Sequence, residues 1–199
     1  TAYEIGVRLV GSEMCIRDSP RDQVGGGPDT DVHAIRIGTA IVTVHDDLLF
    51  LSRDIKQPKV ISAWLNSIAD GEISSLVAME GDKVVGTTAI VRDPLGWSAH
   101  VAELRILISE EMRGKGLGRI LLQHCFAAAI ENGAEKLMAR MTPDQRGAIS
   151  LFEEMGFRGE AMLRDHVRDS EGKVHDLAIL SLDVARAEAQ HGAFGFNDA

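Results

Sequence analysis

The alternation of apolar and polar residues predicts a central strand over residues 102–109. Leu104, Ile106 and Ile108 occupy every second position of this stretch and are expected on one face of the strand. The segment that follows, residues 119–131, is apolar almost all round, which predicts a buried helix that ends at the next Asn-Gly pair. A strand and a buried helix therefore flank a short connection that is rich in glycine.

The same kind of pattern predicts the remaining elements. Val60, Trp64 and Ile68 recur at helical spacing, and a Gly-Asp pair between two alternating segments indicates an antiparallel hairpin. Residues 29–44 are compatible with a helix or a strand, and we expect a helix followed by a loop over 46–53. The pattern as a whole predicts helices over 29–44, 59–69, 119–131 and 143–156, strands over 75–80, 84–92, 102–109 and 135–141, and a final hairpin over 158–184.

Composition narrows the classes of partner. The chain has 199 residues, of which 30 are acidic and 21 basic; the net charge of -9 opposes binding to nucleic acid and mildly favours cationic substrates such as amines. No apolar run approaches the roughly 20 residues of a membrane span, and no signal peptide is recognised, so a cytoplasmic protein without a membrane partner is expected. Cys15 and Cys125 supply neither a disulfide framework nor a zinc cluster, and no metal site is expected.

The first residues look foreign to the fold. Residues 1–19 resemble translated adapter sequence and run into a Gly-Gly-Gly-Pro stretch, so residues 1–28 are expected to be non-native or disordered. The alternative is that YEIGVRLV is an ordinary first strand. A single domain is expected over residues 29–183, followed by a disordered tail over residues 184–199. Without the first segment the chain contains no tyrosine, because Tyr3 is the only one.

The glycine-rich connection, residues 113–118, has the composition of an anion-binding loop. Its three glycines allow backbone N–H groups to turn inward, and the following helix adds unpaired donors and the positive end of its dipole. A Walker A loop is excluded because glycine follows the lysine, and a dinucleotide fingerprint is excluded by Leu121. The spacing that fits is Arg-x-x-Gly-x-Gly, formed by Arg113, Gly116 and Gly118.

This spacing resembles the acetyl-CoA loop of the GCN5-related N-acetyltransferases, the GNAT family. A second motif, AISLFEEMGF from Ala148 to Phe157, resembles the second acetyl-CoA motif of that family, and LRDHVRDSEGKVHDLAIL resembles the last hairpin of its bacterial members. Each motif is weak alone, but the two together, in order and separated by one strand, are specific. The resemblance implies an α+β GNAT fold: a mixed, mostly antiparallel sheet flanked by helices, with splayed central strands.

The resemblance also implies an activity, the transfer of an acetyl group from acetyl-CoA to a primary amine by direct attack. The acceptor is then a small-molecule or protein amine, and a homodimer is one assembly compatible with the family. In the family, the loop amides bind the diphosphate, and free backbone groups of the central strand hold the pantetheine arm. The residues thereby assigned to acetyl-CoA are Leu107, Ile108, Ser109, Arg113, Gly114, Lys115, Gly116, Leu117, Gly118, Arg119, Gln145 and Phe152.

Glu103 is the candidate catalytic base, acting directly or through a water, because an ammonium must lose a proton before its nitrogen can attack. The alternative is an ion pair with Arg105, two residues along on the same face of the strand. His100, at the start of the strand, is a second candidate. Phe152 stands where the family often has the tyrosine that protonates the leaving thiolate, and Gln145 stands in the place of a common asparagine.

Two other functions stay open. The missing tyrosine leaves room for a non-catalytic module that binds or senses acetyl-CoA, and a loop that reads only the diphosphate is compatible with another acyl-CoA. His166 and His175 would face each other across the final hairpin if its turn spans residues 169–172, which resembles a metal site. A polar hairpin without metal is the alternative, and it is the one we expect.

Overall fold

The structure is a computed structural model that describes residues 6–10, 15–16, 58–70, 72–80, 83–169 and 171–187. The helix expected over 29–44 and the loop expected over 46–53 lie outside these residues. The chain divides into two compact units, residues 1–91 with 105–125 and residues 92–104 with 126–199. Strand β5 (Val101–Ile108) and helix α3 (Leu117–Glu131) each contribute residues to both units.

The first unit contains a sheet with strand order β2-β1-β3-β4-β5. Strand β3 (Ile73–Glu80) pairs antiparallel with β4 (Lys83–Val91), and their bounds confirm the strands expected over 75–80 and 84–92. Their connection is the hairpin that the Gly-Asp pair predicted.

Residues near the start of the chain also belong to this sheet. Strand β1 (Gly6–Val10) pairs antiparallel with β2 (Cys15–Ile16) and with residues 75–79 of β3. For residues 6–10 the structure therefore agrees with the alternative interpretation, in which YEIGVRLV is an ordinary strand. A deletion described in the Discussion measures what this strand contributes.

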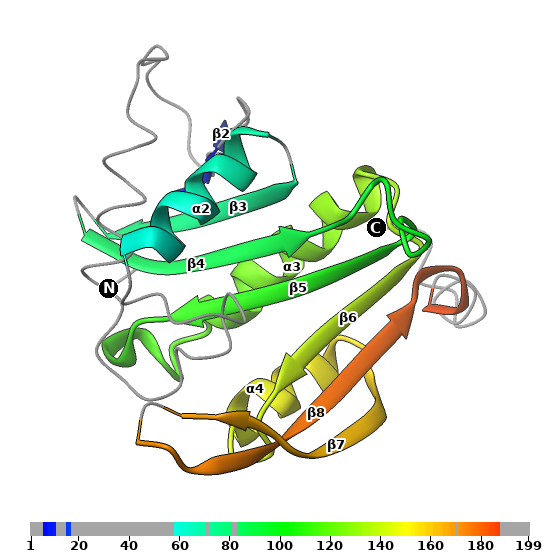
Figure 1. Ribbon diagram of the computed structural model, residues 1–199. Coiled ribbons are helices and arrows are strands. Elements are labelled where there is room, and N and C mark those ends of the chain that lie inside the picture. The colour runs from blue at the N-terminus through cyan, green and yellow to red at the C-terminus, as the bar shows by residue number, and fades with distance from the viewer. Residues whose placement is uncertain are drawn as a thin grey trace. The chain divides into compact units, whose positions relative to one another are not determined.

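Helix α2 (Pro58–Ala69) lies beside β3 and β4 (Figure 1) and confirms the helix expected over 59–69. Trp64 and Ile68 are buried and Val60 is partly buried, as their helical spacing predicted. The cluster that encloses them is completed by Val77, Val84, Ala89 and Leu107. The apolar stripe of α2 thus correctly identified the face that packs on the sheet.

The second unit contains a sheet with strand order β5-β6-β8-β7. Strand β6 (Lys136–Met141) runs parallel to β5 and antiparallel to β8 (Val174–Asp183). Strand β8 forms the final hairpin with β7 (Arg158–Arg168), and β8 is the strand of this hairpin that lies next to β6 (Figure 1). One parallel pair among antiparallel pairs confirms the predicted α+β class with a mixed, mostly antiparallel sheet.

The parallel ladder between β5 and β6 is short. It joins Val101–Glu103 to Lys136–Met138, whereas β6 continues to Met141 and the next residue of β5, Leu104, is outside the ladder. A ladder that stops after three pairs is what splayed central strands require. The last ladder position on β5 is Glu103, the candidate base.

The buried face of the second unit follows a regular alternation on β6. Leu137, Ala139 and Met141 are buried, and the residues between them are partly exposed. Helix α4 (Arg146–Glu154) begins three residues later than expected, because Pro143 occupies a turn in which the N–H of Gln145 donates to the carbonyl of Thr142 at 3.0 Å. Proline is favoured at the second position of such a turn.

The ordered chain extends beyond residue 184, where a disordered tail was expected to begin. Val184 is buried, its N–H donates to the carbonyl of Glu135 at 3.0 Å, and residues 184–187 are helical. The fold therefore continues past residue 183 to at least residue 187.

Candidate active site

Strand β5 leads into the glycine-rich loop, and its burial is not a simple alternation. Leu104 is buried, the next two residues are both partly exposed, and Leu107 is buried. Leu107 packs into the core of the first unit, and Ile108 is partly exposed. That Leu104, Ile106 and Ile108 share one face of the strand stays a prediction.

Ser109, the first residue after β5, has a buried hydroxyl group without a hydrogen-bond partner among the residues that the structure describes. Its backbone is fully engaged, since its N–H donates to the Val85 carbonyl at 3.0 Å and its carbonyl accepts the N–H of Met112 at 3.0 Å. A buried polar group left unpaired costs about 1–3 kcal/mol.

The loop after the 3-10 turn η2 (Glu110–Met112) has the backbone that its glycines predicted. Gly114 and Gly116 have φ angles of 71° and 87°, a region that side chains other than glycine rarely adopt. A Cβ atom built on either residue would meet no heavy atom within 4 Å. The requirement for glycine is therefore conformational, and the space beside the loop is open.

The same loop forms the amino-terminal cap of α3. The Gly116 carbonyl accepts the N–H groups of Arg119 at 3.1 Å and Ile120 at 3.3 Å. Within the described chain, no backbone acceptor is assigned to the N–H groups of Gly114, Gly116, Leu117 and Gly118. These donors, together with the positive end of the α3 dipole, form a site suited to an anion such as a diphosphate.

The basic side chains of this region are exposed, and one of them is directed toward β5. Nε of Arg113 donates to the carbonyl of Ile108 at 3.4 Å, across the start of the loop. Lys115 and Arg119 are exposed, at the tip of the loop and in the first turn of α3. The backbone amides are therefore the fixed donors of this loop, and the exposed lysine and arginine side chains add positive charge around it.

Glu103 lies on β5 and forms an ion pair that was not predicted. Arg140, on β6, donates through Nη2 to Oε2 at 2.6 Å and through Nε to Oε1 at 3.1 Å. The Glu103 side chain is 11% exposed and the Arg140 side chain 29% exposed. From the sequence, Arg105 was the alternative partner of Glu103, and that pairing stays a prediction. Arg140 could have been found from its place on the polar face of the strand expected over 135–141, beside the central strand.

Phe152 and Gln145 both have structural contacts in the second unit. Phe152 is 1% exposed, and its ring packs edge-to-face with Phe157 at a centroid distance of 5.0 Å. Oε1 of Gln145 accepts the N–H of Thr142 at 3.2 Å and so supports the turn before α4. Packing accounts for the place of Phe152, and its assignment to acetyl-CoA stays a prediction.

The histidines of the final hairpin do not face each other. Three residues, 164–166, lie opposite Asp176 alone, and this bulge pairs His175 with Val167 rather than with His166. His175 instead contacts Asp169, with Nε2 and Oδ2 2.8 Å apart. Within the described ranges, no group of three or more His, Cys, Asp and Glu side chains could hold a metal ion. The register that would have placed His166 opposite His175 in a metal-like pair is therefore wrong.

His100 is exposed at the start of β5, and its carbonyl accepts the N–H groups of Glu135 at 2.9 Å and Lys136 at 3.1 Å. Its contribution to the structure is thus made by its backbone. In the part of the chain that the structure describes, the helices are all too short or too polar to cross a membrane.

The chain is similar to known proteins both in sequence and in fold. Bacillus subtilis YwnH, which carries a provisional name as a phosphinothricin acetyltransferase, is 37% identical over 84 residues, or 42% of this chain and 51% of YwnH. The chain spans about half the length, or less, of the curated relatives it matches.

Solved structures show the fold. A GNAT-family acetyltransferase from Streptococcus pneumoniae matches with a TM-score of 0.65 and 21% identity, over 77% of this chain and 95% of that chain. YncA from Salmonella typhimurium, solved with its cofactor acetyl-CoA, matches with a TM-score of 0.62 and 20% identity, over 78% of this chain and 88% of that chain. The sequence pattern of the acetyltransferase (GNAT) family matches residues 41–157, more than half of the chain, and the chain therefore belongs to this family.

Proposed function

We propose that this protein transfers an acetyl group from acetyl-CoA to a primary amine. The observation that carries the proposal is the loop over residues 113–118, where four N–H groups have no backbone acceptor among the described residues and lie at the amino terminus of α3. Acetyl-CoA carries a diphosphate, which is the anion that such a loop binds well. Membership of the acetyltransferase family supports this ligand.

The residues at the end of β5 fit the arm that links the diphosphate to the thioester. The buried Ser109 hydroxyl has no hydrogen-bond partner among the described residues, and the neighbouring Ile108 carbonyl accepts a hydrogen bond from Arg113. An amide of the pantetheine arm supplies both a donor and an acceptor, so it could pair with this hydroxyl. We therefore assign Leu107, Ile108 and Ser109 to this arm, and Gly114, Gly116, Leu117 and Gly118 to the diphosphate.

The reaction needs a neutral amine and a leaving thiolate. The acceptor ammonium gives one proton to the Glu103 carboxylate, directly or through a water. Its nitrogen then forms a bond to the thioester carbon as the carbon–sulfur bond breaks and CoA leaves with the electron pair. The second proton lost by the nitrogen passes through water to the departing thiolate. A thiol has a pKa near 8.5, so its thiolate leaves without a phenol acid. A protein without a tyrosine at residue 152 is therefore compatible with this chemistry.

The test is the release of CoA thiol from acetyl-CoA over a panel of small-molecule and peptide amines. We expect turnover with at least one amine, and loss of acetyl-CoA binding in Gly116→Val, because valine does not tolerate a φ of 87°. Glu103→Gln is expected to lower kcat by about 100- to 10,000-fold with acetyl-CoA affinity unchanged. Undiminished binding by Gly116→Val would remove the loop assignment.

A second candidate function is a module that binds acetyl-CoA without turnover. The observation that favours it is Phe152, buried where a catalytic tyrosine is common in the family. Calorimetric binding of acetyl-CoA with no thiol release on any amine would support this candidate. Release with a different acyl-CoA, but not with acetyl-CoA, would instead identify another acyl transferase.

A further inference from the structure

The Arg140 guanidinium contacts both oxygens of the Glu103 carboxylate. Each oxygen accepts one hydrogen bond from Arg140, at 3.1 Å from Nε and at 2.6 Å from Nη2. Two contacts from a planar guanidinium fix the plane of the carboxylate as well as its position.

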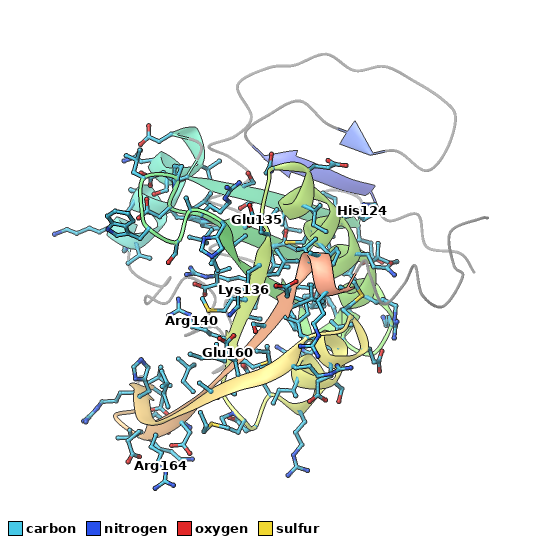
Figure 2. The ribbon with its side chains drawn as sticks, turned by 90° about the vertical axis from the view of Figure 1, so that its right-hand side faces the viewer. His124, Glu135, Lys136, Arg140, Glu160 and Arg164 are labelled. Atoms are coloured by element: carbon cyan, nitrogen blue, oxygen red, sulfur yellow. The ribbon has the colours of Figure 1, made fainter. Side chains whose placement is uncertain are left out.

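The two residues are brought together by the register of the central strands. Glu103 pairs with Met138 at the end of the parallel ladder, and Arg140 is two residues farther along β6. Side chains two residues apart on a strand point to the same face, so Arg140 is the diagonal neighbour of Glu103, within reach of a long side chain. In Figure 2, Arg140 and Lys136 lie along β6. The ion pair therefore forms where the backbone pairing of the two strands stops.

We infer that Arg140 is a positioning residue for acetyl transfer, which fixes the orientation of the Glu103 carboxylate toward the acceptor ammonium. This inference rests on the proposed function. A guanidinium has no acceptor atom, so Arg140 cannot take the place of Glu103 as the base. Its contribution is made through Glu103, whose carboxylate plane is fixed by the two contacts.

The alternative is that the pair only joins two strands. This alternative predicts that removal of Arg140 lowers the melting temperature and leaves the catalytic parameters of the folded protein unchanged. A positioning role predicts a loss of kcat that persists well below the melting temperature, since small errors in the placement of a reacting group cost on the order of 100-fold. The two roles are therefore separated by kinetics rather than by stability.

The experiment compares Arg140→Met, Arg140→Lys, Glu103→Gln and the double variant with both Arg140→Met and Glu103→Gln, each assayed for CoA-thiol release at least about 15 °C below its melting temperature. We expect Arg140→Met to lose about 10- to 100-fold in kcat with unchanged acetyl-CoA affinity by calorimetry. Arg140→Lys keeps the charge but not the fork and is expected to recover only part of the loss. Because Arg140 acts through Glu103, the double variant is expected to match Glu103→Gln within about threefold.

Lys136 is the matched control. It is a cation on the same strand and on the same face, and its Nζ forms an ion pair with Oε1 of Glu160 at 2.8 Å. Lys136→Met removes a neighbouring positive charge of the same sheet and is expected to leave kcat within twofold of the wild type. An equal loss in Lys136→Met would show that the effect comes from net charge and would overturn the inference.

Failure of the inference and failure of the proposed function give different results. Wild-type protein without thiol release on any amine contradicts the proposed function. Wild-type turnover that falls in Glu103→Gln but not in Arg140→Met overturns the inference alone. Losses that multiply in the double variant would show that Arg140 acts independently of Glu103, which also overturns it.

Discussion

Gly86 on β4 is a position where the first unit tolerates little additional volume. A Cβ atom at residue 86 would lie 2.8 Å from Cδ1 of Leu121, 3.2 Å from Cδ1 of Ile108 and 3.4 Å from the carbonyl oxygen of Leu107. Optimal carbon–carbon contacts are about 3.5–4.0 Å, so the Leu121 side chain would have to move by at least about 0.7 Å. Leu121 is fully buried, and the surrounding core leaves it little freedom.

We expect Gly86→Ala to destabilise the protein by about 1–2 kcal/mol. Overpacking of a core costs about 1–3 kcal/mol, and alanine recovers about 0.5–1 kcal/mol through the lower entropy of the unfolded chain. For a protein of this size, 1 kcal/mol corresponds to about 2–4 °C, so the melting temperature should fall by about 2–8 °C. Acetyl-CoA affinity should fall as well, because the added atom presses on Leu107 and Ile108.

The assay is thermal unfolding followed by circular dichroism, with Gly147→Ala as the control. Gly147 lies in α4, and a Cβ there would meet nothing within 4 Å. Alanine at this helical position should stabilise by about 0.5–1 kcal/mol. The double variant with Gly86→Ala and Leu121→Val should be destabilised by less than the sum of the two single variants, with a difference of at least about 0.5 kcal/mol. A melting temperature for Gly86→Ala equal to or above that of the wild type would refute the packing argument.

Three further predictions concern other parts of the chain. Burial raises the pKa of the Cys125 thiol from 9.0 to about 12, so at pH 8.5 the native protein should hold about 1,000-fold less thiolate at this residue than the denatured chain. Iodoacetamide labelling of the native and the denatured protein, measured by mass spectrometry, tests this prediction. Equal labelling of the two would contradict it. Phe152→Tyr should cost about 1–3 kcal/mol by burying a hydroxyl group and change kcat by no more than a few-fold; a gain of two orders of magnitude would instead favour the non-catalytic module. Deletion of residues 1–19 removes β1 and its ladder with β3, so the melting temperature should fall; an unchanged melting temperature would show that this ladder contributes nothing to stability, as expected of foreign sequence.

The sequence alone determined features that depend on residues close together in the chain. The spacing of Val60, Trp64 and Ile68 identified the buried face of α2, because helical periodicity is a local property. The glycines between residues 113 and 118 predicted a turn with freedom to fold its N–H groups inward before a helix, and the positive φ angles of Gly114 and Gly116 show the use of that freedom. The loop and its likeness to an acetyl-CoA site could therefore be recognised before any tertiary contact was known.

The tertiary structure alone decided which strands pair, in which register and with which irregularities. Arg140 reaches Glu103 from 37 positions away because β6 pairs in parallel with β5, and the sequence around Glu103 carries no trace of that pairing. The bulge opposite Asp176 pairs His175 with Val167 instead of with His166. A strand has a side-chain period of two, so one extra residue reverses a face, and the free energy that selects the register comes from contacts distant in sequence.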